Sequence, residues 1–347
     1  MKNEKSTRSN PDGTPVDDEE EADNVLLDNA INHFNKQLED IEKRCHNSNE
    51  YSNDLLEEIT QAIIIMGAAC EEFDKNAGQN TSIIRETQIR FREKTHDVFS
   101  KSYLMNHART WPLGYPGDYT MLEDVYSNTP KSEGIGYYLD EYFLSTTLAV
   151  AVRERKETLR ELLKTELENR KKPKILNIAC GSCREIFQLS AEIEKSEAKV
   201  MCIDFDPRAL DFSTNLLSSA GLVPDRVECR KYNALKMVNQ ERNLEQFGKQ
   251  DVIYSIGLFD YLNNDVLIAL LKSLTGLLND GGKFMATFKD SRSYKTFDYH
   301  WLVSWDAFIQ RTEDDVRSLF EKAGISSESL AYTRDHSGVI FFTIATK

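Results

Sequence analysis

Two short stretches of the sequence place residues that could hold a nucleotide-type ligand. The first, residues 174–185, is an apolar, β-branched run that stops at small residues around Gly181 and then becomes helical. The second, residues 200–206, is a strand-like run that ends in carboxylates, Asp204 among them. A tight turn after a strand lets the backbone approach a ligand, and a carboxylate about 20 residues later can accept hydrogen bonds from ribose hydroxyls. We therefore expect a nucleotide-type site at these two strand ends.

A regular alternation of strand and helix candidates surrounds these residues. Strand-like runs lie at 174–179, 199–204, 227–231, 251–255, 283–288 and 339–346, and helical patterns lie between them at 184–196, 207–220, 235–246, 264–278 and 312–323. Such alternation is typical of a parallel sheet with helices on both faces. A weak strand near 329–333 and a turn at 335–338 precede the last strand. We therefore predict an α/β fold with a Rossmann-like, doubly wound, seven-stranded sheet that is mostly parallel and ends in an antiparallel hairpin.

The first half of the chain carries helical patterns instead. Residues 1–23 are polar and acidic, so we expect a disordered tail there. Amphipathic helices are predicted at 24–45, 52–74 and 81–104, followed by a short helix at 119–126 and one or two helices over 137–170. The expected organisation is a helical N-terminal or lid region over 24–172 and a ligand-binding domain over 173–347. The apolar stripes of the first helices fit packing within the chain, and a homodimer seam is the alternative.

An unusual segment follows the third helix. Residues 109–119 read Arg-Thr-Trp-Pro-Leu-Gly-Tyr-Pro-Gly-Asp-Tyr. The prolines and glycines prevent a regular helix, and the aromatic rings give the resulting loop apolar surfaces. Loops of this kind often carry function, although a structural linker is the alternative.

The order of these segments resembles that of the class I S-adenosylmethionine-dependent methyltransferases over about residues 173–347. The first motif of that family alternates an acidic residue with glycines, and the matching positions here are Asn177, Ala179, Gly181 and Cys183. Only Gly181 keeps the glycine. The resemblance implies S-adenosylmethionine as the cofactor, with Gly181 against its methionine part and Asp204 on its ribose, while Asp206 is the near competitor of Asp204.

Three further segments match the family in the expected order. Residues 232–235 resemble the step that contacts the adenine, residues 251–261 resemble the strand and turn beneath the sulfonium, and residues 277–285 resemble the glycine turn before the fifth strand. The cofactor-binding residues that the resemblance implies are Asn177, Ala179, Gly181, Asp204, Phe205, Asn233, Ala234, Ser255 and Gly257.

Other classes fit the first turn less well. A nicotinamide-dependent oxidoreductase would need Gly-x-Gly-x-x-Gly after the first strand, which residues 180–184 do not supply, and no Gly-Lys-Ser/Thr of a phosphate-binding loop follows a strand. The pair Cys180 and Cys183 could be redox-active or half of a zinc site, but no second such pair and no histidine pattern completes four ligands. We expect these cysteines to be small buried residues, and we expect no metal.

A narrower resemblance joins the aromatic loop to the first turn. Segments similar to residues 109–118 and to the Ala-Cys-Gly of residues 179–181 occur in the bacterial group that makes 3-hydroxy fatty-acid methyl ester signals. This resemblance, from about residue 104 to the end, implies methylation of the carboxyl oxygen of a long-chain 3-hydroxy acid. The loop would then line the acceptor pocket, with Tyr137 and Tyr142 nearby, and Arg109 or Arg153 would pair with a carboxylate. The predicted substrate-binding residues are Arg109, Trp111, Tyr115, Tyr119, Tyr138, Arg153 and Tyr261.

Methyl transfer to a carboxylate does not need a strong catalytic base. Methyl transfer from a sulfonium is an in-line displacement, so the protein mainly positions and desolvates the acceptor. A carboxylate is ionised at neutral pH because its reference pKa is about 4, whereas an amine or an alcohol often needs a base. The candidate catalytic residues are Asp260, His300 and Tyr115, and the lack of a more obvious base agrees with a carboxylate acceptor.

Composition limits the remaining classes. The 347 residues carry a net charge of −14, which argues against a large sequence-independent nucleic-acid surface. Base methylation is also disfavoured, because Gly-Leu-Phe-Asp-Tyr at 257–261 stands where an Asn/Asp-Pro-Pro-Tyr-like turn would be expected. No apolar run approaches the roughly 18–20 residues of a membrane span, the first residues lack a signal-peptide core, and scattered cysteines fit a reducing compartment. We expect a cytoplasmic enzyme with a small-molecule acceptor. The alternatives are an N- or O-methyltransferase of a secondary metabolite and a non-catalytic, cofactor-binding interaction protein.

Overall fold

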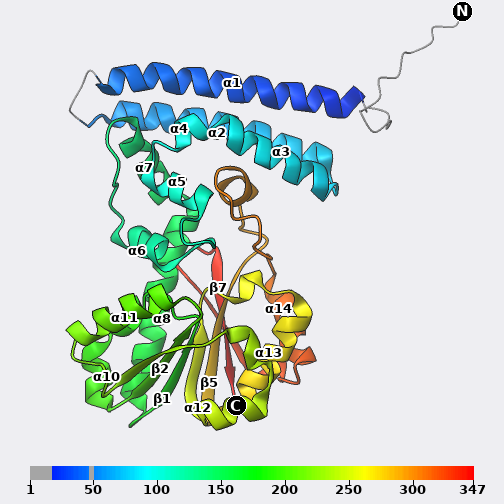
Figure 1. Cartoon of the computed structure of the whole chain (residues 1–347). Helices are drawn as coiled ribbons and strands as arrows, with labels where there is room; N and C mark the ends of the chain where they lie inside the picture. The colour runs from blue at the N-terminus through cyan, green and yellow to red at the C-terminus, as the bar shows by residue number, and fades with distance from the viewer. Residues whose placement is uncertain (1–17, 47–50) are drawn as a thin grey trace, which may run out of the picture. The chain divides into compact units, whose positions relative to one another are not determined.

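The computed structural model describes residues 18–46 and 51–347, and Figure 1 shows the course of the chain. The chain divides into two compact units. The helical unit consists of the described residues up to Pro116, together with Thr129–Thr146 and Lys295–Trp305. The sheet unit consists of Gly117–Asn128, Thr147–Tyr294 and Asp306–Lys347. Helix α8 (Thr147–Asn169) belongs to the sheet unit, although the sequence places it before the predicted boundary at residue 173.

Seven strands form one sheet in the order β3-β2-β1-β4-β5-β7-β6. Their bounds are β1 Lys174–Ile178, β2 Lys199–Asp204, β3 Val227–Lys231, β4 Gln250–Ser255, β5 Leu278–Lys289, β6 Leu330–Arg334 and β7 Ile340–Thr346. Strands β1 to β5 pair in parallel, whereas β7 is antiparallel to both β5 and β6. The predicted fold class, with its closing antiparallel hairpin, is confirmed. The strand order reverses between β1 and β4, and ligands of such sheets bind at the carboxyl ends of the strands beside this switch point.

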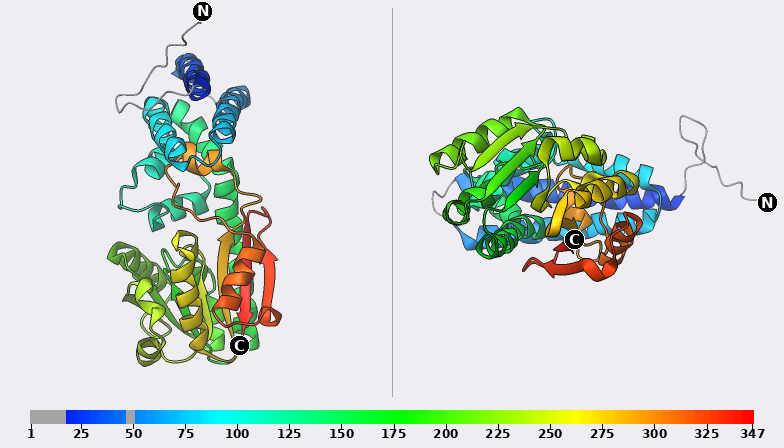
Figure 2. Two further views of the ribbon diagram at one scale, coloured as in Figure 1. Left: turned by 90° about the vertical axis from the view of Figure 1, so that its right-hand side faces the viewer. Right: turned by 90° about the horizontal axis from the view of Figure 1, so that it is seen from below.

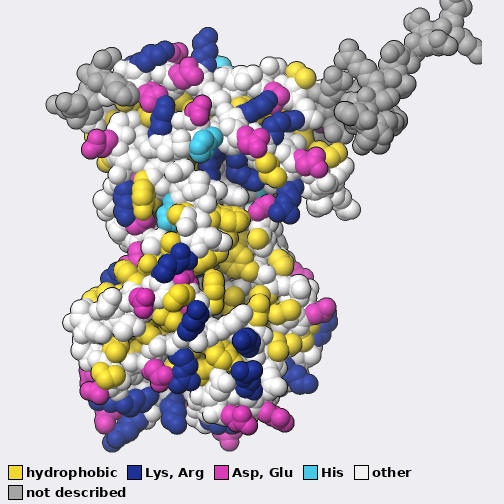
Figure 3. Space-filling model, viewed as in Figure 1, with side chains coloured by type: hydrophobic (Ala, Val, Ile, Leu, Met, Phe, Trp, Pro, Cys, Tyr) yellow, Lys and Arg dark blue, Asp and Glu magenta, His cyan; other side chains and the backbone are white. Residues whose placement is uncertain are grey.

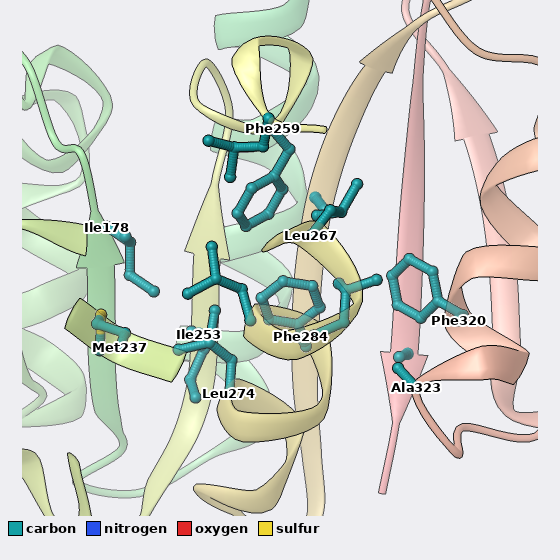
Figure 4. Close-up of a cluster of buried hydrophobic side chains, with 14 of the residues drawn as sticks. Ile178, Met237, Ile253, Phe259, Leu267, Leu274, Phe284, Phe320 and Ala323 are labelled. Atoms are coloured by element: carbon teal, nitrogen blue, oxygen red, sulfur yellow. The ribbon is translucent and has the colours of Figure 1, made fainter. Parts of the chain in front are cut away.

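Helices cover both faces of the sheet, and each strand points alternate side chains to opposite faces. Ile178, Ile253 and Phe284 point to one face and pack with η1 (Ala234–Val238), α13 (Asn264–Gly276) and α14 (Glu313–Lys322), as Figure 4 shows. Ile175, Val252 and Met285 point to the other face and pack with α8, α9 (Arg184–Gln188), α10 (Ser190–Ser196) and α11 (Pro207–Ser219). Figure 2 shows these helices from two further directions.

Shorter elements complete the sheet unit. They are α6 (Tyr119–Ser127), α12 (Gln240–Phe247), and the turns η2 (Phe259–Tyr261) and η4 (Ser327–Ser329). Gly281 and Gly282, predicted as a turn before the fifth strand, lie within β5. The pairing of β4 with β5 shifts register there, between Gln250 and Val252, so the strand continues through an irregularity.

The helical unit is built on two long helices, α1 (Asp18–His46) and α2 (Asn53–Ala77). It also contains α3 (Thr81–Lys94), α4 (His96–Phe99), α5 (Tyr103–Thr110) and α7 (Ile135–Ser145). The tail predicted at residues 1–23 lies outside the described residues up to residue 17, and the chain is helical from Asp18. The predicted apolar stripes of α1 and α2 are buried, among them Phe34, Ile63 and Met66. Packing within the chain therefore accounts for these side chains.

The third predicted helix, 81–104, is interrupted at Thr95. The Thr95 hydroxyl donates a hydrogen bond to the Phe91 carbonyl oxygen at 2.8 Å, and the backbone restarts as α4. A second restart follows at Ser102, whose hydroxyl accepts from the backbone N–H of Met105 and so caps α5. These polar contacts at helix ends explain why one periodic pattern forms three helices.

A π-helical turn, η3 (Phe297–Trp301), also belongs to the helical unit. The Trp301 ring packs against the edges of Phe73 and Phe91, and its indole N–H donates to Asp74 at 3.0 Å. The ring of Phe297 lies 3.1 Å from where a Cβ on Gly67 would stand, so a larger residue at position 67 would require the ring to shift by a few tenths of an ångström.

Charged side chains of both signs are interspersed on the face shown in Figure 3. Among the described helices, none is both long and apolar enough to cross a membrane.

Candidate active site

The turn after β1 has a backbone conformation that favours glycine. Ala179, Gly181 and Cys183 all have left-handed conformations, with φ values of 55°, 54° and 53°. These are the three positions at which the motif that this stretch resembles carries glycines, and here alanine and cysteine adopt the left-handed conformation beside Gly181. The turn is closed by the backbone N–H of Cys183, which donates to the Cys180 carbonyl oxygen at 3.1 Å.

Asp204 ties this turn to the end of β2. Its Oδ2 accepts a hydrogen bond from the backbone N–H of Gly181 at 2.9 Å, and its Oδ1 accepts from the backbone N–H of Asp206 at 3.0 Å. Burial raises the pKa of the Asp204 carboxyl, against the opposing effect of these N–H donors. An ionised carboxylate can accept about four hydrogen bonds, so both oxygens retain capacity for the ribose hydroxyls of a nucleoside. Asp206 instead caps α11 and binds the Arg208 side chain, which favours Asp204 over its competitor.

A buried hydrogen-bond network lies behind the turn. The Asn177 side-chain amide donates to the Glu185 carboxylate at 3.0 Å, and the Tyr254 hydroxyl donates to the same carboxylate oxygen at 2.8 Å. Burial raises the pKa of Glu185 to about 7, with a smaller raising contribution from Cys183. Glu185 and Tyr254 were absent from the predicted site. The sequence does contain a signal for Glu185, because this carboxylate lies at the end of residues 174–185, where Asn177 stands at the position that is acidic in the motif this stretch resembles.

The remaining predicted cofactor residues occupy the neighbouring strand ends. The Asn233 side-chain oxygen accepts from the backbone N–H of Leu235 at 2.9 Å and so caps η1, while Ala234 is buried. Phe205 presents a ring that is 54% exposed, directly after the ribose candidate Asp204. On β4, the Ser255 hydroxyl donates to the Ile178 carbonyl oxygen at 2.9 Å. That bond joins the carboxyl ends of β1 and β4 at the switch point.

The base candidate Asp260 is engaged in a buried ion pair. Its Oδ2 lies 2.5 Å from the Lys289 ammonium, and the exposed fractions of the two side chains are 2% and 4%. The backbone N–H of Lys289 also donates to Asp260. The ammonium lies 3.8 Å from the centroid of the Phe308 ring, which packs against Tyr261. Burial raises the pKa of Tyr261. Lys289 was not predicted, because a lysine at a strand end normally faces solvent.

The predicted substrate residues divide between the two units. Tyr119, Arg153 and Tyr261 belong to the sheet unit, and the Tyr119 ring packs on Phe212 with centroids 5.2 Å apart. Burial lowers the pKa of Arg153. Arg109, Trp111, Tyr115, Tyr138 and His300 belong to the helical unit.

The Arg109 side chain is hydrogen-bonded within that unit through all three of its nitrogen atoms. Its guanidinium donates to the carbonyl oxygens of Leu302 and Arg92 and to the Thr95 hydroxyl, and it lies 4.4 Å from the centroid of the Phe99 ring. Burial lowers its pKa to about 9. These contacts describe a structural cation that holds the α3–α4 junction.

The other predicted residues of the helical unit have contacts of their own. The Trp111 indole N–H donates to the Ala108 carbonyl oxygen at 3.1 Å, and Trp111 caps α5 in a left-handed conformation. The Tyr138 hydroxyl accepts from the backbone N–H of Ser52 at 3.0 Å. The His300 carbonyl oxygen accepts a hydrogen bond from Arg92.

The six cysteines are all free thiols. Cys180, Cys183 and Cys202 are buried in the core cluster on the α8–α11 face of the sheet. Within the described residues, no group of three or more His, Cys, Asp or Glu side chains has the arrangement of a metal site.

Comparisons with known proteins bear on the sheet unit. Residues 176–284 match the family described as "Methyltransferase domain", and no curated protein matches the sequence. A crystal structure of a possible exported protein from Bordetella parapertussis has 20% sequence identity and a TM-score of 0.54, with coverage of 66% of this chain and 79% of its own. This likeness concerns the fold.

Two further structures are more distant. Magnesium protoporphyrin IX methyltransferase from Synechocystis PCC 6803, with bound SAH, has 12% identity and a TM-score of 0.44, covering 58% of this chain and 85% of its own. An O-methyltransferase family protein from Burkholderia thailandensis has 15% identity and a TM-score of 0.44, covering 60% and 62%. The family match itself runs from β1 into β5 and includes the turn at Gly181 and Asp204. It supports the predicted methyltransferase class for these residues, and with it the expectation of S-adenosylmethionine as the cofactor.

Proposed function

We propose that the protein methylates a carboxylate oxygen of a small molecule, such as a 3-hydroxy fatty acid. The observation that carries this proposal is the buried ion pair of Asp260 with Lys289. Asp260 is the predicted base nearest to the turn after β4, and both of its carboxylate oxygens already accept hydrogen bonds from Lys289. An acceptor that is already ionised needs no such base.

The residues proposed to hold the cofactor follow from the strand ends. The left-handed turn leaves room above Gly181, where a Cβ would meet only Leu122, at 3.9 Å. The free acceptor capacity of Asp204 suits ribose hydroxyls, the exposed ring of Phe205 suits an adenine face, and Asn233 stands at the next strand end. When bound, S-adenosylmethionine supplies a methyl group on a sulfonium, and transfer forms an O–CH₃ bond as the S–CH₃ bond breaks, leaving an ester and S-adenosylhomocysteine.

The chain then has two tasks in the reaction. It must orient the carboxylate in line with the breaking bond, and it must remove water from the carboxylate oxygens, which makes them better nucleophiles. Aromatic and apolar side chains beside the turn after β4, including Phe259, Tyr261 and Phe308, serve the second task.

Two measurements on the full chain test the proposal. Calorimetry should show binding of S-adenosylhomocysteine, and Asp204→Asn should weaken it about ten- to hundredfold, since hydrogen bonds to a charged group contribute about 1.5–3 kcal/mol. Asp211→Asn, at an exposed position of α11, is the matched control and should leave the affinity unchanged. Mass spectrometry after incubation with S-adenosylmethionine and 3-hydroxydodecanoate, its amide or a phenol should show product only from the acid. Product from the amide or phenol alone would contradict the proposed acceptor, and the absence of cofactor binding would contradict the function as a whole.

A further inference from the structure

We propose that Arg155 is the carboxylate receptor of this active site, an inference that rests on the proposed function. Arg155 lies on α8 and is 4% exposed. The ligand chemistry is a carboxylate, and two molecules could bring one: the acceptor and the methionine part of the cofactor.

The position of the guanidinium points to the switch point of the sheet. One of its terminal nitrogens, Nη1, lies 3.8 Å from where a Cβ on Gly257 would stand. Gly257 follows β4 within the stretch that the sequence places beneath the sulfonium. The guanidinium therefore reaches the turn after β4 from α8, at the edge of the sheet where Gly181 and Asp204 also lie.

The charged and titratable groups around Arg155 come from four other elements. Arg155 donates a hydrogen bond to the Tyr126 hydroxyl of α6, and it interacts electrostatically with Glu185 of α9, Tyr261 of η2 and Lys289 of β5. Lys289 is already paired with Asp260, and the Glu185 carboxylate already accepts from Asn177 and Tyr254. Within residues 18–46 and 51–347, no carboxylate lies within ion-pair distance of Arg155, and its buried Nε has no hydrogen-bond partner.

Another buried arginine of the same unit shows what a structural role looks like. Arg311 is 3% exposed, and its guanidinium donates to the carbonyl oxygens of Phe259 and Leu262 and to the Asn264 side chain. A buried cation without such partners is costly unless an anion is supplied. The planar guanidinium fork binds carboxylates through two parallel hydrogen bonds. An incoming carboxylate is therefore the group that Arg155 is equipped to receive.

The test uses Arg155→Met and Arg155→Lys in the full chain. Methionine keeps much of the apolar stem, and lysine keeps the charge but lacks the fork. Arg160→Met on the same helix, at a half-exposed arginine paired with Glu157, is the matched control. Thermal unfolding of each variant reports whether the protein is folded. If the Arg155→Met variant does not fold, the Arg155→Lys variant is used for the binding measurements.

Two sets of probes distinguish the sources of the carboxylate. If it belongs to the cofactor, the variants should bind S-adenosylhomocysteine about ten- to hundredfold more weakly but keep the wild-type affinity for 5′-methylthioadenosine, which lacks the amino-acid part. If it belongs to the acceptor, S-adenosylhomocysteine binding should be unchanged. Binding of 3-hydroxydodecanoate or hexanoate to the protein saturated with S-adenosylhomocysteine should then fall by a similar factor, with no change for the corresponding amides.

Two outcomes overturn the inference. One is equal loss of affinity for S-adenosylhomocysteine and 5′-methylthioadenosine, which indicates a structural role. The other is a result in which the variants bind S-adenosylhomocysteine as tightly as wild type and also bind 3-hydroxydodecanoate and hexanoate as tightly as wild type. Failure of the proposed function looks different, because wild type itself would then not bind the cofactor or would not methylate the acid.

Discussion

The Asn177 side-chain amide donates a 3.0 Å hydrogen bond to the Glu185 carboxylate. In the motif that this stretch resembles, the first of these positions is acidic. Here the carboxylate comes from α9 instead, and the strand position supplies its donor. A carboxyl group is therefore present beside residue 177, but Glu185 supplies it and residue 177 does not.

Asn177→Asp should therefore destabilise the protein. It would replace a donor with a second buried carboxylate beside Glu185, and like charges at this distance cannot both ionise without cost. We expect the free energy of unfolding in urea at pH 8 to fall by about 2–3 kcal/mol. The double variant Asn177→Asp/Glu185→Gln exchanges donor and acceptor and should recover at least half of this loss. Losses that simply add in the double variant would argue against direct coupling of the two side chains.

Glu185 should also give the stability a pH dependence. Its pKa is raised by burial from 4.5 to about 7, so at low pH the carboxyl is protonated in both states. Between about pH 4.5 and 7 the unfolded chain releases the proton while the folded protein keeps it, so the free energy of unfolding decreases as pH rises. The decrease attributable to Glu185 is on the order of 3 kcal/mol. Urea unfolding at pH 5.5 and 8.5 should show a smaller fall in Glu185→Gln than in wild type, and parallel pH profiles would contradict this assignment.

Ala179→Gly should stabilise the protein, contrary to the usual effect of this substitution. The left-handed conformation at φ 55° costs an alanine about 1–2 kcal/mol, whereas glycine adopts it freely at an entropic cost of about 0.5–1 kcal/mol. We expect the free energy of unfolding to rise by up to about 1 kcal/mol. Ala191→Gly, at an exposed helical position in α10, should instead lower it by about 0.5–1 kcal/mol. If both substitutions destabilise equally, the conformation of the turn does not constrain residue 179.

Asp260→Ala should destabilise strongly. It would leave the Lys289 ammonium buried without its counter-charge, and breaking a buried pair in this way costs about 3–5 kcal/mol. Asp260→Leu/Lys289→Met, which removes both charges, should recover most of the loss in urea unfolding. The exposed Asp265→Asn in the first turn of α13 is the control and should change little. A small effect of Asp260→Ala alone would mean that the pair is not buried in solution.

Much of the sheet could be predicted because its signals are local. The strands at 199–204 and 227–231 have the predicted bounds, since each is a short run of alternating or continuous apolar residues between turn residues. The start of β5 could not be placed, because Gly281 and Gly282 read as a turn while their strand pairing with β4 depends on a register shift. The π-helical turn at 297–301 was equally hidden. Its aromatic side chains are fixed by Phe73 and Phe91, which are more than two hundred residues earlier in the chain.

In the candidate site, too, some residues could be predicted from local sequence signals and others could not. The contact of Asp204 with Gly181 follows from a turn and a strand end that are neighbours in a parallel sheet. Lys289 and Arg155 could not be singled out, because their importance lies in burial, and a sequence gives no sign of a charge that the fold takes out of water. Arg109 shows the opposite case. It stands out in the sequence because of the loop that it begins, yet its guanidinium is hydrogen-bonded within the helical unit.

The helical unit is assembled from three separate passages of the chain, the last of which, Lys295–Trp305, lies between β5 and α14. No single cut can therefore release the sheet unit intact. A fragment beginning at residue 147 would carry Phe297, Trp301 and Trp305 without the helices that bury them, and would present those rings to solvent as a site for aggregation. The two units therefore cannot be separated by truncating the chain at one position, and each depends on the other being expressed with it.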